Sequence, residues 1–185
     1  MNFYSDDITK GIQSAQELDE FYKTVFILSC KYSNTIVSPK YILSLVSDKS
    51  NSIAFRCIDT EFNVHNCPSI LIYYKHFDSV KNEDMYYILM ICTKRSFKNM
   101  GYASGLLDDF IGHIRNTREN ANTCRIALSS IETAVTFYEQ YGFKWMRTSL
   151  TDHPKLMDFE RYDAEKEYFI LELVVSREPM PAHSA

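Results

Sequence analysis

The chain has 185 residues, a formal net charge of −4 and 14% aromatic residues, among them 13 Tyr and 12 Phe. This length predicts a single domain with one core, and the acidic balance argues against a nucleic-acid binder, which would carry a basic stripe. Because no window is apolar enough to span a membrane and residues 1–10 do not resemble a secretory signal, we expect a soluble, cytoplasmic protein.

The five cysteines are Cys30, Cys57, Cys67, Cys92 and Cys124. Their number is odd and no C-x-x-C pair occurs, so neither a metal site nor a disulfide framework is expected. Several lie in apolar runs, which is typical of reduced cysteines in a core.

The first half of the chain predicts one strand, two helices and three further strands. A short strand is expected at residues 2–8. A capping box at Ser14 and Glu17 begins an amphipathic helix that runs to about residue 30, and Ser38-Pro39 begins a short second helix. Strand-like runs follow at residues 52–58, 69–74 and 85–93, joined by polar connections that suit hairpins.

The second half begins with the clearest helical period of the chain, at residues 103–114. A short strand is expected at 124–128, followed by a capping box at Ser129 and Glu132 that begins a helix ending near Gly142. Strands at 143–150 and 168–175 complete the series. This order predicts an α/β (α+β) fold with a mixed sheet of about seven strands over residues 1–176, and a flexible tail over 177–185.

The segment before the helix at 103–114 has the composition of an anion site. A strand, a glycine-bearing turn and a helix N-terminus present unpaired amide N–H groups together with the helix dipole. Gly101 allows close approach of the backbone to an anion, and Lys98 adds a positive charge. A turn with one glycine is more often only a turn, and the P-loop and dinucleotide fingerprints are both incomplete.

Two sequence motifs carry a resemblance to a known family. In residues 91–107, ICTKRSFKNMGYASGLL, an apolar strand leads through a pattern close to [Q/R]-x-x-G-x-[G/A] into a Leu-rich helix, and residues 134–143, AVTFYEQYGF, follow the pattern A-x-x-(F/L)-Y-E-x-x-G-F. These segments resemble motif A and motif B of the GNAT superfamily of acetyltransferases. The chain departs from the family at Lys98, where Gln or Arg is usual, and at Ile131, where many members have Asn.

The resemblance implies that acetyl-coenzyme A lies where the fourth and fifth strands splay apart. Its pantetheine arm would pair with the backbone of the fourth strand, with the Thr93 N–H near the thioester carbonyl. The residues implied in binding the cofactor are Ile91, Cys92, Thr93, Lys98, Asn99, Met100, Gly101, Tyr102, Ala103, Ser104 and Ser130.

The resemblance also implies direct transfer of the acetyl group to a primary amine by a monomer or a homodimer. Tyr138 matches the tyrosine that protonates the departing thiolate in many members, although the position also suits a core aromatic residue. Glu83 and Asp84 are candidates for the general base, but each also suits a solvated turn. The acceptor is expected to be a polyamine-like small molecule, a lysine side chain or a peptide N-terminus, because residues 151–167 carry a net charge of −3.

Two other functions fit the same residues. One is a non-catalytic module that binds or senses an acyl-coenzyme A through the same fold, which the absence of a carboxylate within the central strand favours. The other is an unrelated α/β nucleotide-binding protein.

Overall fold

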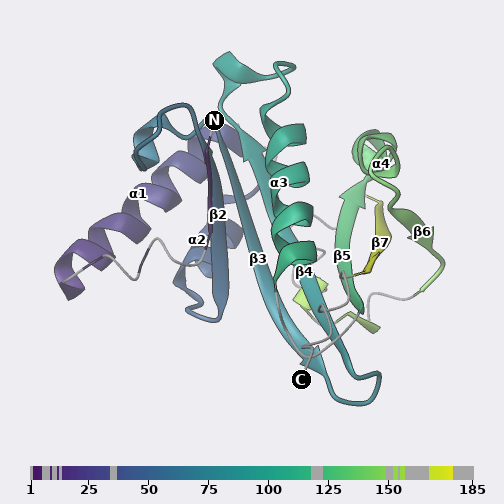
Figure 1. Cartoon of the computed structure of the whole chain (residues 1–185). Coiled ribbons are helices and arrows are strands. Elements are labelled where there is room, and N and C mark those ends of the chain that lie inside the picture. The colour runs from purple at the N-terminus through teal and green to yellow at the C-terminus, as the bar shows by residue number, and fades with distance from the viewer. Residues whose placement is uncertain are drawn as a thin grey trace, which may run out of the picture.

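One mixed sheet of seven strands, in the order β1-β2-β3-β4-β5-β7-β6, organises the chain (Figure 1). The computed structural model describes residues 2–5, 9, 12, 14–33, 37–117, 123–148, 152–153, 155–156 and 167–176. The strands are β1 (Asn2–Tyr4), β2 (Asn51–Cys57), β3 (Ser69–Asp78), β4 (Glu83–Thr93), β5 (Thr123–Ile131), β6 (Lys144–Met146) and β7 (Tyr168–Ser176). All neighbouring strands are antiparallel except β4 and β5, which are parallel.

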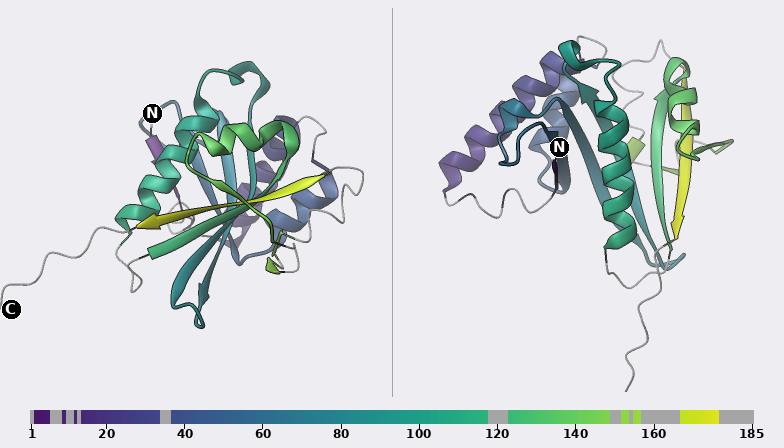
Figure 2. Two further views of the ribbon diagram at one scale, coloured as in Figure 1. Left: turned by 90° about the vertical axis from the view of Figure 1, so that its right-hand side faces the viewer. Right: turned by 45° about the horizontal axis from the view of Figure 1, so that its top comes forward.

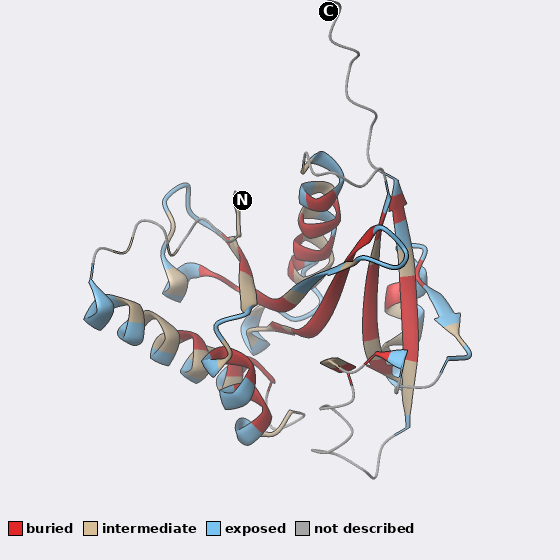
Figure 3. Ribbon diagram, turned by 90° about the horizontal axis from the view of Figure 1, so that it is seen from below, coloured by how far each residue is buried: buried red, intermediate tan, exposed pale blue. Residues whose placement is uncertain are grey.

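Helices cover both faces of this sheet (Figures 1 and 2). The helices are α1 (Ala15–Ser33), α2 (Pro39–Ser47), α3 (Tyr102–Asn116) and α4 (Glu132–Glu139). Buried side chains of α1 and α2 form one apolar cluster with one face of the sheet, and those of α3 and α4 form a second cluster on the other face. The buried middle strands lie between these two layers in Figure 3. No helix among the described residues is both long and apolar enough to cross a bilayer.

The predicted fold class and order of elements are confirmed. The Ser14 and Ser38 hydroxyls accept hydrogen bonds from the N–H groups of Glu17 and Tyr41, each at 3.2 Å, as expected for helix N-caps. Residues 6–8, 149–150 and the tail at 177–185 lie outside the described residues.

The predicted capping box at Ser129 and Glu132 is wrong. β5 continues to Ile131, which pairs with Tyr168 of β7, so Ser129 belongs to the strand. The N-cap of α4 is Ile131, which makes no side-chain capping bond. Pairing along the whole of β7 therefore outweighed the local signal for a helix start.

The sequence predicts no disulfide framework, but the structure contains one disulfide. Cys57 at the end of β2 and Cys67 just before β3 form a disulfide, with Cα atoms 4.1 Å apart. The other three cysteines, Cys30, Cys92 and Cys124, are free. An odd total gave no hint of this pair, because the two residues meet only when β2 and β3 pair.

Candidate functional site

The parallel ladder between β4 and β5 ends halfway along both strands. It runs from the pair Asp84 and Cys124 to the pair Ile88 and Leu128, while β4 continues to Thr93 and β5 to Ile131 (Figure 1). The two strands therefore diverge over their last residues. We call the space between these diverging ends the β4–β5 gap.

A β-bulge in β4 begins where the ladder ends. On the β3 side, Ile72 pairs with Met90 and Tyr73 pairs with Ile88, so Leu89 is the extra residue. Bulges bend a strand and re-aim the groups that follow it. The Tyr41 hydroxyl of α2 donates a hydrogen bond of 3.3 Å to the Leu89 carbonyl, so a buried side chain holds the bulge.

Backbone groups of β4 beyond the bulge point into the gap. The Lys94 N–H donates to the Pro68 carbonyl at 2.8 Å, and positions alternate along an antiparallel ladder. It follows that the backbone N–H and C=O groups of Cys92 form hydrogen bonds with β3. The N–H and C=O groups of Ile91 and Thr93 point away from β3. The edge at Ile91 and Thr93 can therefore accept an extended ligand as an additional strand.

The turn before α3 meets the end of β4. Asn99 and Gly101 have positive φ, 62° and 80°, and Gly101 is the N-cap of α3. The first intrahelical bond runs from the Gly105 N–H to the Gly101 carbonyl at 2.8 Å, so the amides of residues 102–104 lack helical acceptors. A Cβ added at Gly101 would meet nothing within 4 Å, which shows that this backbone faces open space.

One amide of the predicted anion site is already used. The Met100 N–H donates to the Phe97 carbonyl at 3.3 Å, because the turn at Arg95–Phe97 is a short 3-10 helix. The predicted set is therefore reduced to Asn99, Gly101, Tyr102, Ala103 and Ser104, with the exposed Lys98 beside them. These amides and the helix dipole favour an anion at the N-terminus of α3.

A cavity of about 160 Å³ lies in the β4–β5 gap. Tyr138 of α4 lines it and is 8% exposed, and burial raises the pKa of its phenol well above the ordinary value. The hydroxyl therefore stays protonated at neutral pH. The wall includes Ile88, Leu89, Met90 and Ile91 from β4, and Leu128, Ser129, Ser130 and Ile131 from β5.

Of the two serines on β5, Ser129 and not Ser130 has an unused hydroxyl. Ser130 Oγ donates to the Ile131 carbonyl at 3.0 Å, whereas the buried Ser129 Oγ has no hydrogen-bond partner among the described residues. A buried hydroxyl without a partner is costly. Ser129 is therefore the better-placed polar group for a ligand in the gap.

Cys92 does not belong to the site. Its thiol packs in the cluster under α1 and α2, and burial raises its pKa to about 12. Its backbone position pairs with Ile70 of β3. Both its side chain and its backbone are therefore used by the fold.

Glu83 and Asp84 also lie away from the gap, at the opposite end of β4. Leu89 is six positions after Glu83, which is about 20 Å along a strand. The Arg125 Nε donates to Glu83 at 3.2 Å, and Lys75 lies 3.9 Å from Asp84. We therefore withdraw both carboxylates as candidates for the base.

The structure instead brings together three residues that the sequence analysis missed. His153 Nε2 lies 3.2 Å from Glu172 Oε1, and Arg125 Nη1 donates to Glu172 Oε2 at 2.7 Å. The hydrogen bond from His153, with that from Arg125, lowers the pKa of Glu172. A signal was present, because Arg125 is the one charged residue of β5 and Glu172 is the one charged residue of β7.

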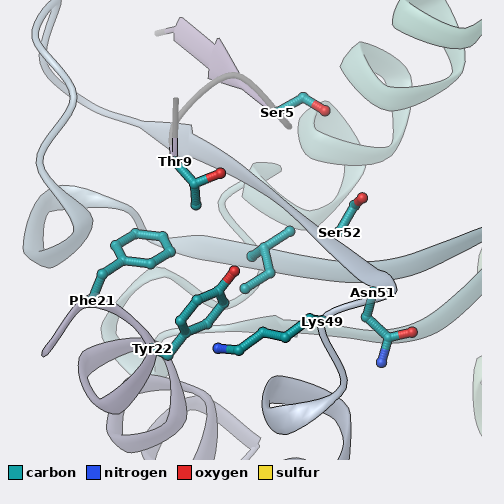
Figure 4. A pocket seen from close by; sticks show the side chains of 8 residues that line it. Ser5, Thr9, Phe21, Tyr22, Lys49, Asn51 and Ser52 are labelled. Carbon is teal, nitrogen blue, oxygen red and sulfur yellow. The ribbon is translucent and has the colours of Figure 1, made fainter. Parts of the chain in front are cut away.

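The acidic segment at residues 151–167, from which an amine acceptor is expected, falls mostly on residues 157–166, which lie outside the described residues. A further pocket, of about 150 Å³, lies between α1 and β2 (Figure 4). Its Lys49 ammonium sits 3.3 Å from the centre of the Tyr22 ring. This pocket is two strands from β4 in the sheet order, so it is not part of the site.

Comparisons with known proteins agree on the family. Residues 76–153 match the family model of the acetyltransferase (GNAT) domain. Among solved structures, GCN5 of Tetrahymena is 12% identical with a TM-score of 0.61, over 95% of this chain and 96% of that one. NAA60 of Arabidopsis thaliana with a bisubstrate analogue is 10% identical with a TM-score of 0.56, over 94% and 98%.

A third structure, the NatC complex bound to Gag peptide and CoA, is 15% identical with a TM-score of 0.56, over 95% of this chain and 99% of that one. The search of curated proteins found no matching sequence. The splayed parallel pair of strands, the open helix N-terminus and the domain match define an acyltransferase. Residues 76–153 of this chain therefore match a GNAT acetyltransferase domain, within a fold like that of the GNAT structures.

Proposed function

We propose that the chain is an N-acetyltransferase that transfers the acetyl group of acetyl-coenzyme A to a primary amine by direct attack. The observation that carries the proposal is the open β4 edge at Ile91 and Thr93 beside the N-terminus of α3. The edge suits the pantetheine amides, and the helix terminus suits the pyrophosphate. Three structural neighbours, at 11–15% identity, are bound to coenzyme A, acetyl-coenzyme A or a coenzyme A bisubstrate analogue.

The order of groups along β4 supports one position for the thioester. Thr93 is the β4 residue nearest in sequence to the turn at Asn99–Gly101, so a cofactor anchored on that turn passes Thr93 first. Its reactive end then lies toward Ile91 and the bulge at Leu89. We therefore place the Ile91 N–H, rather than that of Thr93, at the thioester carbonyl, where it stabilises the developing oxyanion.

Tyr138 stands on the other side of the same cavity. In the proposed reaction the amine nitrogen attacks the carbonyl carbon, the carbon–sulfur bond breaks, and the Tyr138 hydroxyl gives its proton to the departing thiolate. Its raised pKa keeps that proton available at neutral pH. Ser129 is proposed to hold the cofactor arm where many family members use an Asn, at the position of Ile131.

Two measurements test the proposal. Calorimetric titration with coenzyme A measures cofactor binding. Release of free thiol from acetyl-coenzyme A is then followed with spermidine, a lysine-containing peptide and a peptide with a free α-amine. We expect binding, and turnover that depends on an amine. Binding without turnover of any amine would favour the non-catalytic module, and no binding would refute the proposal.

Several structural neighbours favour a peptide acceptor. They include NatC with a Gag peptide, Naa50 with a peptide-linked analogue, and a ribosomal-protein-alanine N-acetyltransferase of Brucella melitensis. A peptide N-terminus is therefore the acceptor that we would test first.

A further inference from the structure

A second cavity opens on the α1 and α2 side of the sheet, alongside the paired half of β4, and reaches from the β3–β4 hairpin to Tyr87. Its volume is about 380 Å³. It is lined by Tyr74, His76, Asp78, Lys81, Met85, Tyr87, Asp152, His153 and Lys155. Tyr87 is two residues before Leu89, which is about 7 Å along the strand. The cavity therefore approaches the place where the thioester is proposed to lie.

His153 is the buried titratable group of this cavity. It is 5% exposed, and its ring packs edge-on against Tyr87 with 5.8 Å between centroids. Its Nε2 bonds the carboxylate of Glu172. Its Nδ1 is buried and has no hydrogen-bond partner among the described residues.

These contacts determine which nitrogen of His153 carries the hydrogen. Glu172 stays ionised because His153 and Arg125 both donate to it, and the pKa of its carboxyl is lowered. A carboxylate accepts hydrogen bonds only, so the hydrogen of a neutral His153 lies on Nε2. Nδ1 then holds a free lone pair, which is what a general base requires.

We propose that His153, oriented by Glu172, takes the proton from the acceptor amine, and that the cavity beside it receives that amine. This inference rests on the proposed acetyl transfer. Glu172 acts as a positioning residue, and Arg125 keeps it ionised and in place through the 2.7 Å bond. No carboxylate of β4 is needed as the base.

The protons balance over the whole step. An acceptor ammonium gives one proton to His153 Nδ1 and becomes a neutral amine. The amine attacks, and the carbon–sulfur bond breaks. The second proton that leaves the nitrogen replaces the one that Tyr138 gives to the thiolate, so the products are the amide, coenzyme A and a protonated His153 that releases its proton to water.

The positive and negative charges on the described wall of this cavity balance one another, so the wall is not strongly acidic. Its two carboxylates, Asp78 and Asp152, are matched by the ammonium groups of Lys81 and Lys155. Lys155 already bonds Asp48 at 3.1 Å and lies 4.2 Å from the Tyr74 ring centre. The described wall therefore does not select for a polycation, and it suits a single amine such as a peptide N-terminus.

His153→Gln is the informative variant, because the glutamine amide can keep the hydrogen bond to Glu172 but has no basic nitrogen at the position of Nδ1. We expect kcat to fall by about 100-fold with a free-α-amine peptide, while the Kd for coenzyme A stays within about twofold. Glu83→Gln is the matched control, since it removes the other carboxylate on Arg125 without touching His153. It should retain kcat.

The dependence of kcat/KM on pH separates a base from a structural residue. If His153 is the base, the wild-type profile should have an acidic limb that the His153→Gln profile lacks. The titratable or charged groups near His153 are Glu172 from β7, Arg125 from β5, Tyr87 from β4, Asp78 and His76 from β3, Lys81 from the β3–β4 turn, Asp48 through Lys155, and Asp152 and Lys155 on its own segment. Retention of kcat, or of the acidic limb, in His153→Gln would overturn the inference while leaving the proposed function intact.

A second measurement needs no acceptor. Imidazole nitrogen NMR, with the His153 signal assigned by its loss in His153→Gln, should show the hydrogen of the neutral ring on Nε2. In Glu172→Gln this preference should weaken. A hydrogen on Nδ1 in the wild type would overturn the inference. A wild type that acetylates no amine would instead refute the proposed function itself.

Discussion

A charge placed at Gly101 should specifically destroy cofactor binding. Gly101 has φ of 80°, and an added side chain meets nothing within 4 Å, so room is not the obstacle. Asn and Asp tolerate this left-handed conformation better than other side chains. Gly101→Asn and Gly101→Asp should therefore cost a similar free energy of unfolding, about 1 kcal/mol, and differ only in charge.

The size of the charge effect follows from Coulomb's law. A carboxylate about 5 Å from one phosphate charge costs about 0.8 kcal/mol at the dielectric constant of water and about 3 kcal/mol at an effective value of about 20. For an exposed site with two phosphate charges we expect about 2 to 3 kcal/mol, or about 30- to 140-fold in Kd.

Calorimetry with coenzyme A measures the two variants side by side, with thermal unfolding as the check on folding. The difference should shrink as the salt concentration rises from about 0.05 M to about 0.5 M, because exposed charges are screened. Equal affinities for the Asp and Asn variants at low salt would refute the reasoning that the α3 N-terminus binds the pyrophosphate.

Three further outcomes are expected. Tyr138→Phe should lower kcat about 100-fold in the thiol-release assay with little change in the Kd for coenzyme A, and an unchanged kcat would remove Tyr138 from the reaction. Asp48→Asn should destabilise the protein at pH 6 but progressively less below pH 4 in urea unfolding. The reason is that bonds from Ser50 and then Lys155 lower the pKa of Asp48 from 3.8 to about 2, so its stabilising contribution is present above the unfolded value and is lost as the pH falls through the folded one. A constant difference would contradict this assignment. Cys92→Ala should keep kcat within about twofold, and Cys92 of the wild type should resist alkylation, because its thiol faces the core and has a pKa of about 12. A large loss of kcat in this variant would return Cys92 to the site.

Hydrophobic period was enough to predict the order of the elements, because most of the helices and strands bury one face or both, although β1 and β6 hold no buried residue. The period at residues 103–114 corresponds to the buried side of α3, from Leu106 to Ile114. The boundaries were less predictable where pairing with a distant strand extends an element. β5 reaches Ile131 only because β7, more than 30 residues later, pairs with it.

The two parts of the candidate site also differed in how well they could be predicted from the sequence. The turn before α3 is local, so Gly101 and its neighbours were visible as a motif. The group of Arg125, His153 and Glu172 comes from three separate segments, and its two hydrogen bonds form only after β5 and β7 pair. The expected bases Glu83 and Asp84 were near the correct strand but at its wrong end, which requires knowing where the β4–β5 ladder stops.

The short ladder between β4 and β5 has a mechanical consequence. Five residue pairs, from Asp84 with Cys124 to Ile88 with Leu128, join a half-sheet of four strands to a half-sheet of three. A molecule seated in the open half of this junction touches both half-sheets and serves as a removable crosslink between them. At a concentration of 100 times its Kd, such a molecule adds about 2.7 kcal/mol to the resistance to unfolding, and amide hydrogen exchange should slow on both sides of the junction together.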